Sequence, residues 1–163
     1  MLSPWVVQHE ALAPFTCAAP EQDPEPLPYL QDPARVMFDL TMKVEIKPEF
    51  CQEPFTVSTA RFRDLYWTFE QMLTHHTVSG CNITAGDIIA SGTVSSEGEG
   101  AQGCLLELTE NGKRPLQLSA GCQRTWLQNG DTVCMTATAD NGRVRIGFGP
   151  CKTTVTPAVM YRT

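Results

Sequence analysis

RVMFDLTMKVEIK, residues 35–47, is the stretch that decides the fold class of this sequence. Apolar and polar residues alternate along it, with the apolar set at Val36, Phe38, Leu40, Met42, Val44 and Ile46. A period of two predicts a β-strand with one buried face and one face in water. A strand of that kind is typical of antiparallel sheets.

Short strands and turns follow further along the chain. We predict strands at residues 87–94, 104–109, 131–138 and 143–148, with Asn-Gly turn signals at 111–112, 129–130 and 141–142. Pro115 weakens the first of these as a hairpin, because proline cannot donate to a strand pair. Turns at this spacing predict a mainly β fold, an antiparallel roll, sandwich or barrel.

One main helix interrupts the β pattern, from about Arg61 to Thr77. Ser58 or Thr59 could cap its start, and Gly80 could end it. Upstream, six prolines between Pro14 and Pro33 disfavour regular structure. We therefore expect one domain, residues 1–163, whose opening segment 1–34 is proline-rich and irregular.

Composition excludes several classes of function. The formal net charge is −6 and no Lys/Arg run occurs, so a nucleic-acid footprint is disfavoured. No apolar run approaches the ~18 residues that a membrane span needs, and the first residues do not resemble a signal peptide. The seven cysteines are odd in number and none forms a CxxC pair, which disfavours zinc sites and disulfides and favours a cytoplasmic location.

Glu107 is the residue whose pattern points most directly to chemistry. It lies in Cys104-Leu-Leu-Glu-Leu108, a run that is apolar on both faces of the predicted strand. A buried carboxylate needs a partner or takes up a proton. Two interpretations stay open: an edge position that reaches water, and a carboxylate that orients a catalytic histidine.

Other candidate residues give weaker signals. The small residues Ser91-Gly92-Thr93 could let a ligand approach the backbone, with the threonine hydroxyl as a donor. His75 and His76 are adjacent and point to different sides of a helix, so helix packing or capping is favoured over metal binding. Asp87 after Gly86 is typical of a turn. No P-loop, GxSxG, HExxH or dinucleotide motif occurs.

Several stretches resemble the C-terminal portion of the fumarylacetoacetase family, in the same order and over essentially the whole chain. The most specific block runs from Leu73-Thr74-His75-His76 to Ala90-Ser91-Gly92-Thr93. The remaining matches are Ser3–Val7, Ala11–Phe15, Gln22–Pro24, Pro26–Leu30, Tyr66–Thr68, Gly80–Asn82, Gly86-Asp87, Leu106–Leu108 and Arg145–Gly149.

The resemblance implies a β-roll, a homodimer and a divalent cation, calcium or magnesium. It also implies hydrolysis of a carbon–carbon bond in 4-fumarylacetoacetate to give fumarate and acetoacetate, in phenylalanine and tyrosine catabolism. In that family a histidine held by a glutamate activates water, and the cation polarises the diketone. Residue by residue, Glu107 matches the glutamate that pairs with the catalytic histidine, and Thr93 matches a threonine that contacts substrate.

The family's catalytic histidine, its acidic metal ligands and its Arg, Lys and Tyr substrate contacts have no counterpart from Ser3 onward. We therefore expect the 163-residue chain alone to bind no metal or other cofactor and to be inactive. Three hypotheses stay open: part of a working fumarylacetoacetase, a non-catalytic dimerisation or interaction module derived from it, and another hydrolase or decarboxylase of the superfamily.

Overall fold

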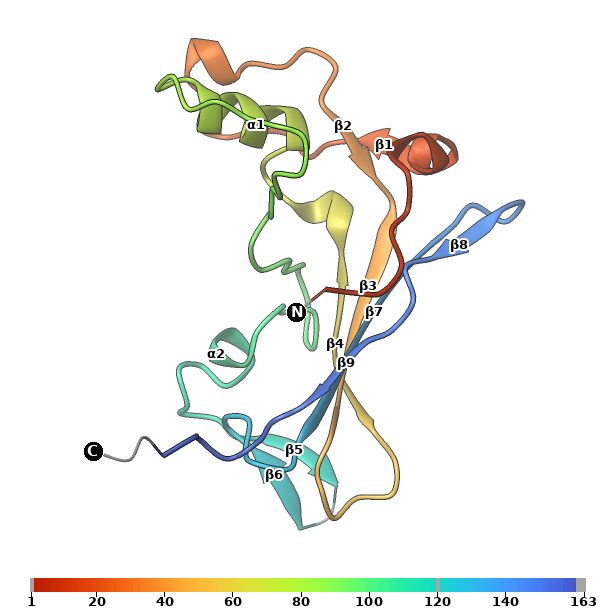
Figure 1. The fold of residues 1–163 in the computed structure, drawn as a ribbon, viewed down its shortest axis with the longest axis vertical. Coiled ribbons are helices and arrows are strands. Elements are labelled where there is room, and N and C mark those ends of the chain that lie inside the picture. Colours follow the sequence, from red (N-terminus) through yellow and green to blue (C-terminus); the bar gives the residue numbers. More distant parts are fainter. Residues whose placement is uncertain (1, 120, 161–163) are drawn as a thin grey trace.

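A single antiparallel sheet forms the centre of the molecule. The computed structural model describes residues 2–119 and 121–160. In the sheet, β3 (Leu40–Lys47) lies between β4 (Phe55–Arg61) and β7 (Thr132–Asp140), and β8 (Arg145–Gly147) and β9 (Cys151–Thr154) pair with opposite ends of β7. Figure 1 shows an elongated molecule with α1 (Phe69–Thr77) towards one end and the β5–β6 hairpin (Leu116–Ser119, Cys122–Arg124) at the other. The prediction of a mainly β, antiparallel fold is confirmed.

The alternating stretch is extended as predicted, but it forms two strands with different partners. β2 (Val36–Phe38) pairs with β1 (Thr16–Ala18), whereas β3 pairs with β4 and β7. The break is at Asp39, whose N–H donates to the carbonyl of Phe15 at 2.8 Å. The predicted alternation therefore fails at its start: Met37 is buried and Val36 is exposed, because β2 does not continue the faces of the central sheet.

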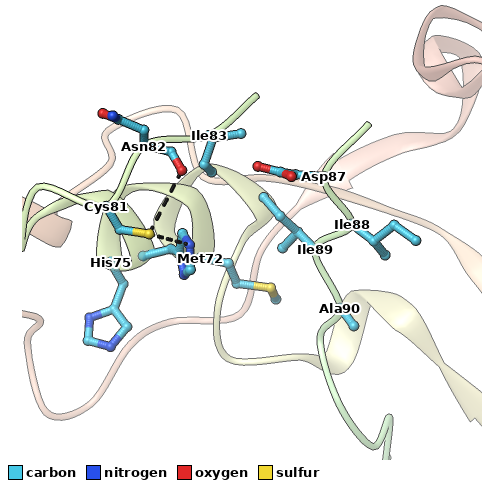
Figure 2. Close-up of a pocket in the computed structure, with 10 residues that line it drawn as sticks. Met72, His75, Cys81, Asn82, Ile83, Asp87, Ile88, Ile89 and Ala90 are labelled. Carbon is cyan, nitrogen blue, oxygen red and sulfur yellow. Dashed lines mark hydrogen bonds between the residues drawn. The ribbon is translucent and has the colours of Figure 1, made fainter. Parts of the chain in front are cut away.

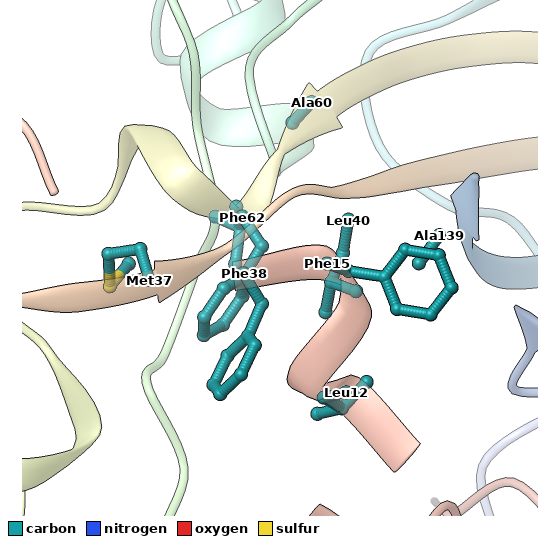
Figure 3. Close-up of a cluster of buried hydrophobic side chains, with 9 residues drawn as sticks. Leu12, Phe15, Met37, Phe38, Leu40, Ala60, Phe62 and Ala139 are labelled. Carbon is teal, nitrogen blue, oxygen red and sulfur yellow. The ribbon is translucent and has the colours of Figure 1, made fainter. Parts of the chain in front are cut away.

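The core lies where β1 begins and β2 passes into β3, and Figure 3 shows its buried side chains. The 3₁₀ helix η1 (His9–Phe15) packs Leu12 and Phe15 into this core. A second 3₁₀ helix, η3 (Phe62–Asp64), adds Phe62 directly after β4. The buried cluster consists of Leu12, Phe15, Met37, Phe38, Leu40, Ala60, Phe62, Val94 and Ala139.

The main helix begins later than the sequence predicted. Ser58 and Thr59 lie in β4, so neither caps a helix. The true cap is the buried Thr68, whose Oγ1 accepts from the N–H of Gln71 while the Gln71 side chain accepts from the N–H of Thr68. The predicted end at Thr77 is confirmed.

A glutamine pair ties this helix to the proline-rich segment. The Gln71 amide donates to Gln22 at 3.0 Å and to the carbonyl of Leu30 at 2.8 Å, and Gln22 donates back to Gln71. Leu30 ends η2 (Pro28–Leu30) and is buried. Over the described residues 2–34, the chain thus carries η1, β1 and η2, joined by stretches without regular structure.

Two predicted strands are wrong. Residues 87–94 are not in a strand, because no described strand pairs with them. Ile88 in this segment is 73% exposed. Residues 104–109 contain a one-turn helix, α2 (Leu105–Leu108). The strands predicted at 131–138 and 143–148 are confirmed as β7 and β8, joined by the Asn141-Gly142 turn.

A buried ion pair joins β6 to the start of β7. Both oxygens of Asp131, whose side chain is 0% exposed, accept from Arg124 at 2.8 Å. Burial alone would raise the pKa of the Asp131 carboxyl. Hydrogen bonds from Arg124 and from the N–H of Gln128 outweigh burial, and the pKa lies below its usual value.

Candidate functional site

Glu107 lies on α2, and its carboxylate is exposed in this chain. Its Oε2 accepts from Ser95 Oγ at 2.6 Å and from Cys104 Sγ at 3.5 Å. The interpretation of a carboxylate buried in a two-faced strand is therefore wrong, because the apolar run folds into a helix that turns Glu107 outward. A serine that the sequence did not single out holds one carboxylate oxygen and leaves the other for a further donor.

The residues that follow α2 have left-handed backbone conformations. Thr109 is buried and its hydroxyl donates to the carbonyl of Leu105 at 2.7 Å. Glu110, Asn111 and Gly112 then have φ values of 49°, 58° and 82°. The N–H of Asn111 returns to the carbonyl of Leu106 at 2.8 Å. Asn111-Gly112 therefore terminates a helix and does not form a hairpin between two strands.

Thr93 lies against Gly103, which precedes α2 in the chain. Thr93 is exposed and without regular structure. A Cβ at Gly103 would overlap the carbonyl oxygen of Val94 and lie 2.7 Å from Thr93 Cγ2, so only glycine allows this approach. The N–H of Gly103 donates to Ser95 Oγ at 3.0 Å, the same hydroxyl that holds Glu107. The structure thus brings both predicted site residues to one junction.

The strand β4 supports this junction through its backbone. The N–H of Arg61 donates to Ser96 Oγ at 2.8 Å, and the N–H of Thr59 donates to the carbonyl of Gly100 at 2.8 Å. The N–H of Ser96 reaches the carbonyl of Ala101 at 2.9 Å and closes the loop between them. An open cavity of about 710 Å³ borders Glu107, with Glu110, Arg114 and Gln117 among its lining residues. A small molecule of ordinary size fits a cavity of this volume.

His75 and His76 line a second cavity of about 580 Å³, where Figure 2 labels His75. His75 Nδ1 lies 3.2 Å from the hydroxyl of Tyr29, and His76 Nε2 lies 3.2 Å from Cys81 Sγ. Asp87 accepts from the N–H of Thr84 at 2.8 Å, as expected of a turn residue. The bond of Asp87 agrees with its interpretation as a turn residue. Both histidines are exposed, and the interpretation of them as packing or capping residues stays a prediction.

The described side chains do not fit a metal site. In residues 2–119 and 121–160, no three His, Cys, Asp or Glu side chains gather where they could hold a metal ion. The ligands of the cation that the resemblance implies are therefore not offered by these side chains. The same residues include no helix with the length and apolar character that crossing a bilayer requires.

Comparison with known proteins identifies the group to which this chain belongs. Residues 1–156 match the family described as "Fumarylacetoacetate (FAA) hydrolase C-terminal". The chain is 46% identical to the fumarylacetoacetase of Oryza sativa subsp. japonica over 158 residues, 97% of this chain and 37% of that protein. It is 44% identical to the fumarylacetoacetase of Bos taurus over 160 residues, 98% of this chain and 38% of that protein.

The chain is 42% identical to the fumarylacetoacetase of Homo sapiens over 159 residues, 98% of this chain and 38% of that protein. This chain thus spans somewhat more than a third of the length of the curated relatives that it matches. The matched region includes the most specific block, the Ser95–Gly103 junction and α2. The chain belongs to the fumarylacetoacetate hydrolase family, to its C-terminal part.

Proposed function

We propose that this chain is the C-terminal part of a fumarylacetoacetase, which hydrolyses 4-fumarylacetoacetate to fumarate and acetoacetate in phenylalanine and tyrosine catabolism. The family match and the shared name of the relatives support this assignment. The observation that carries it is the junction at Ser95 and Gly103, which brings Thr93 and the exposed carboxylate of Glu107 to one place.

In this proposal Glu107 is a positioning residue. Ser95 fixes the carboxylate through Oε2, and the other oxygen accepts the N–H of a histidine supplied by the rest of the enzyme. That bond selects the imidazole tautomer whose second nitrogen removes a proton from water. The hydroxide attacks the ketone beside the double bond, and the carbon–carbon bond breaks. The products are fumarate and the enolate of acetoacetate, which then takes up the proton.

Thr93 has the role of a substrate contact. Its side chain is exposed next to the junction, and its hydroxyl can donate to a substrate carboxylate. Because Gly103 packs against its methyl group, the side chain is held by contact while the hydroxyl remains available. A hydrogen bond to a charged group is worth roughly 1.5–3 kcal/mol.

Further parts of the proposal rest on the family alone. The complete enzyme is proposed to be a homodimer and to use calcium or magnesium. The described side chains do not supply the ligands of that cation, so no step of the proposed mechanism runs through it. A cytoplasmic location is proposed because all seven cysteines are free thiols.

The test is a chimaera in which this chain replaces the matching 158 residues of the rice enzyme. Glu107→Gln in the chimaera should lower turnover by about 10²- to 10⁴-fold and leave the unfolding midpoint nearly unchanged. Glu110→Gln is the matched control, because Glu110 is also exposed at the end of α2 but pairs with Arg114. Full turnover in the Glu107 variant would remove this residue from the mechanism.

Thr93→Val tests the substrate contact in the same chimaera. It should raise the Michaelis constant roughly 10- to 100-fold, and Thr93→Ser, which keeps the hydroxyl, should restore most of the affinity. If valine and serine behave alike, Thr93 does not bind substrate through its hydroxyl.

One observation favours the second candidate, a non-catalytic interaction module. An apolar groove of about 330 Å³ lies between α2 and the sheet, and Leu106, Trp126 and Met135 on it are 52%, 46% and 46% exposed. Apolar surface of this kind is typical of interfaces. A chimaera that folds and associates normally but shows no hydrolysis would favour this candidate over the enzyme.

A further inference from the structure

Two cysteines from distant parts of the chain lie side by side near the β5–β6 end of the sheet. Cys51 lies in the turn between β3 and β4, and Cys122 is the first residue of β6. Their sulfur atoms are 3.9 Å apart although the residues are 71 positions apart in sequence. This is the one sulfur–sulfur hydrogen bond among the described residues. Both side chains are partly exposed, so small molecules can reach them.

We propose that Cys51 and Cys122 form a thiol–disulfide exchange site, which reacts with a low-molecular-weight disulfide such as oxidised glutathione and closes to an intramolecular disulfide. The sulfur atoms must approach from 3.9 Å to about 2.05 Å, a distance that side-chain rotation can cover. No local pattern in the sequence marks the pair, because an odd cysteine count without a CxxC motif argues against a disulfide.

The surroundings assign different roles to the two sulfurs. Cys122 accepts from the Cys51 thiol, and the Arg124 guanidinium lies 4.0 Å from Cys122 Sγ. Asp131 fixes that guanidinium from the other side. Burial, followed by the hydrogen bond to Cys122, raises the pKa of Cys51, while Arg124 and Lys47 partly offset this. Cys122 therefore accepts from Cys51 and lies beside a guanidinium group, and this placement suits the attacking sulfur.

The exchange balances without a further reactant. The Cys122 thiolate attacks one sulfur of oxidised glutathione, the disulfide bond breaks, and one glutathione leaves as a thiolate that takes up a proton. Cys51 then loses its proton and attacks the Cys122 sulfur, and the second glutathione leaves. Two protein thiols and one glutathione disulfide become one protein disulfide and two glutathione thiols, so the protein is oxidised by two electrons.

A Cys51–Cys122 disulfide would fix one wall of the cavity beside Glu107. Leu116 and Gln117 of β5 line that cavity, and β5 pairs with β6, which carries Cys122. A link from Cys122 to the β3–β4 turn would hold this hairpin against the central sheet. Other thiols have different neighbours: Cys81 lies beside His76, and Cys104 lies beside the Glu107 carboxylate, so neither has a second sulfur as its hydrogen-bond partner among the described residues.

The experiment oxidises the purified full chain in glutathione buffers, traps free thiols by alkylation, and maps the peptides by mass spectrometry. We expect a linked Cys51–Cys122 peptide pair in about tenfold excess over any other pairing. Cys51→Ser should stop at a glutathione adduct on Cys122, and Cys122→Ser should lose the disulfide altogether. Cys151→Ser is the matched control and should oxidise like wild type.

Two outcomes would overturn the proposal. One is alkylation of both Cys51 and Cys122 under conditions in which Cys81 carries glutathione. The other is accumulation of single glutathione adducts on wild-type Cys51 or Cys122 without closure. The peptide map of the wild-type chain decides between closure and these outcomes even if a serine variant fails to fold.

Discussion

Replacing Arg124 by methionine should be among the most damaging single changes outside the apolar core. The variant keeps most of the side-chain volume but removes both 2.8 Å hydrogen bonds to Asp131, whose carboxylate is 0% exposed. Removing one partner of a buried pair costs about 3–5 kcal/mol. Arg124 is itself 12% exposed, so water can partly replace it, and we expect a loss near the lower end, about 3 kcal/mol.

The size of this loss should depend on pH. The folded-state pKa of Asp131 lies below its unfolded value, so its stabilising contribution is complete above the usual carboxyl pKa of about 4. It is lost as the pH falls through the folded-state pKa. The difference between wild type and Arg124→Met should therefore be greatest at neutral pH and should shrink below about pH 4.

Urea denaturation followed by circular dichroism measures the effect. A double-mutant cycle with Asp131→Asn should give a coupling energy of about 2 kcal/mol or more. Arg114→Met is the matched control, because its ion pair with Glu110 is exposed and water screens it. A coupling energy below about 0.5 kcal/mol, or equal losses in the Arg114 and Arg124 variants, would refute the reasoning.

Three further predictions test other parts of the structure. Thr68→Ala should cost about 1–2 kcal/mol of unfolding free energy, because it removes the cap on Gln71, whereas the exposed Thr74→Ala should cost less; equal losses would contradict the cap. Gly103→Ala should cost about 1–3 kcal/mol through its overlap with Val94, measured by thermal unfolding, and an unchanged midpoint would contradict that overlap. Calorimetric titration with calcium or magnesium should show no micromolar binding to the 163-residue chain, because such ions need about six or more oxygen ligands.

The sequence predicted those elements whose signal is local. Alternation identified β3, and the Asn-Gly signals at 129–130 and 141–142 identified the strand β7 and its hairpin to β8. The strand β4 was missed because Ser58 and Ala60 occupy its buried positions, where large apolar residues would have shown the pattern. The start of α1 was recoverable, since Thr68 followed three residues later by Gln71 is a capping-box signal.

The site was less predictable, because its parts meet only in the folded chain. The short apolar run around Glu107 suits a strand or a helix equally, and the left-handed residues that follow it decide for the helix. No local sequence pattern points to Ser95, yet its hydroxyl donates to Glu107 and accepts from the N–H of Gly103. The roles of Glu107 and Thr93 stay predictions that come from the family resemblance.

The place of β3 in the middle of the sheet has a consequence for synthesis on the ribosome. β3 can pair with β4 almost at once, but its other edge waits for β7, since Lys47 pairs with Thr132 and Leu40 with Ala139. Roughly 90 residues separate the two strands, and at 5–20 residues per second they take about 5–20 s to emerge. During that interval the nascent chain presents an unpaired strand edge, open to any other extended segment.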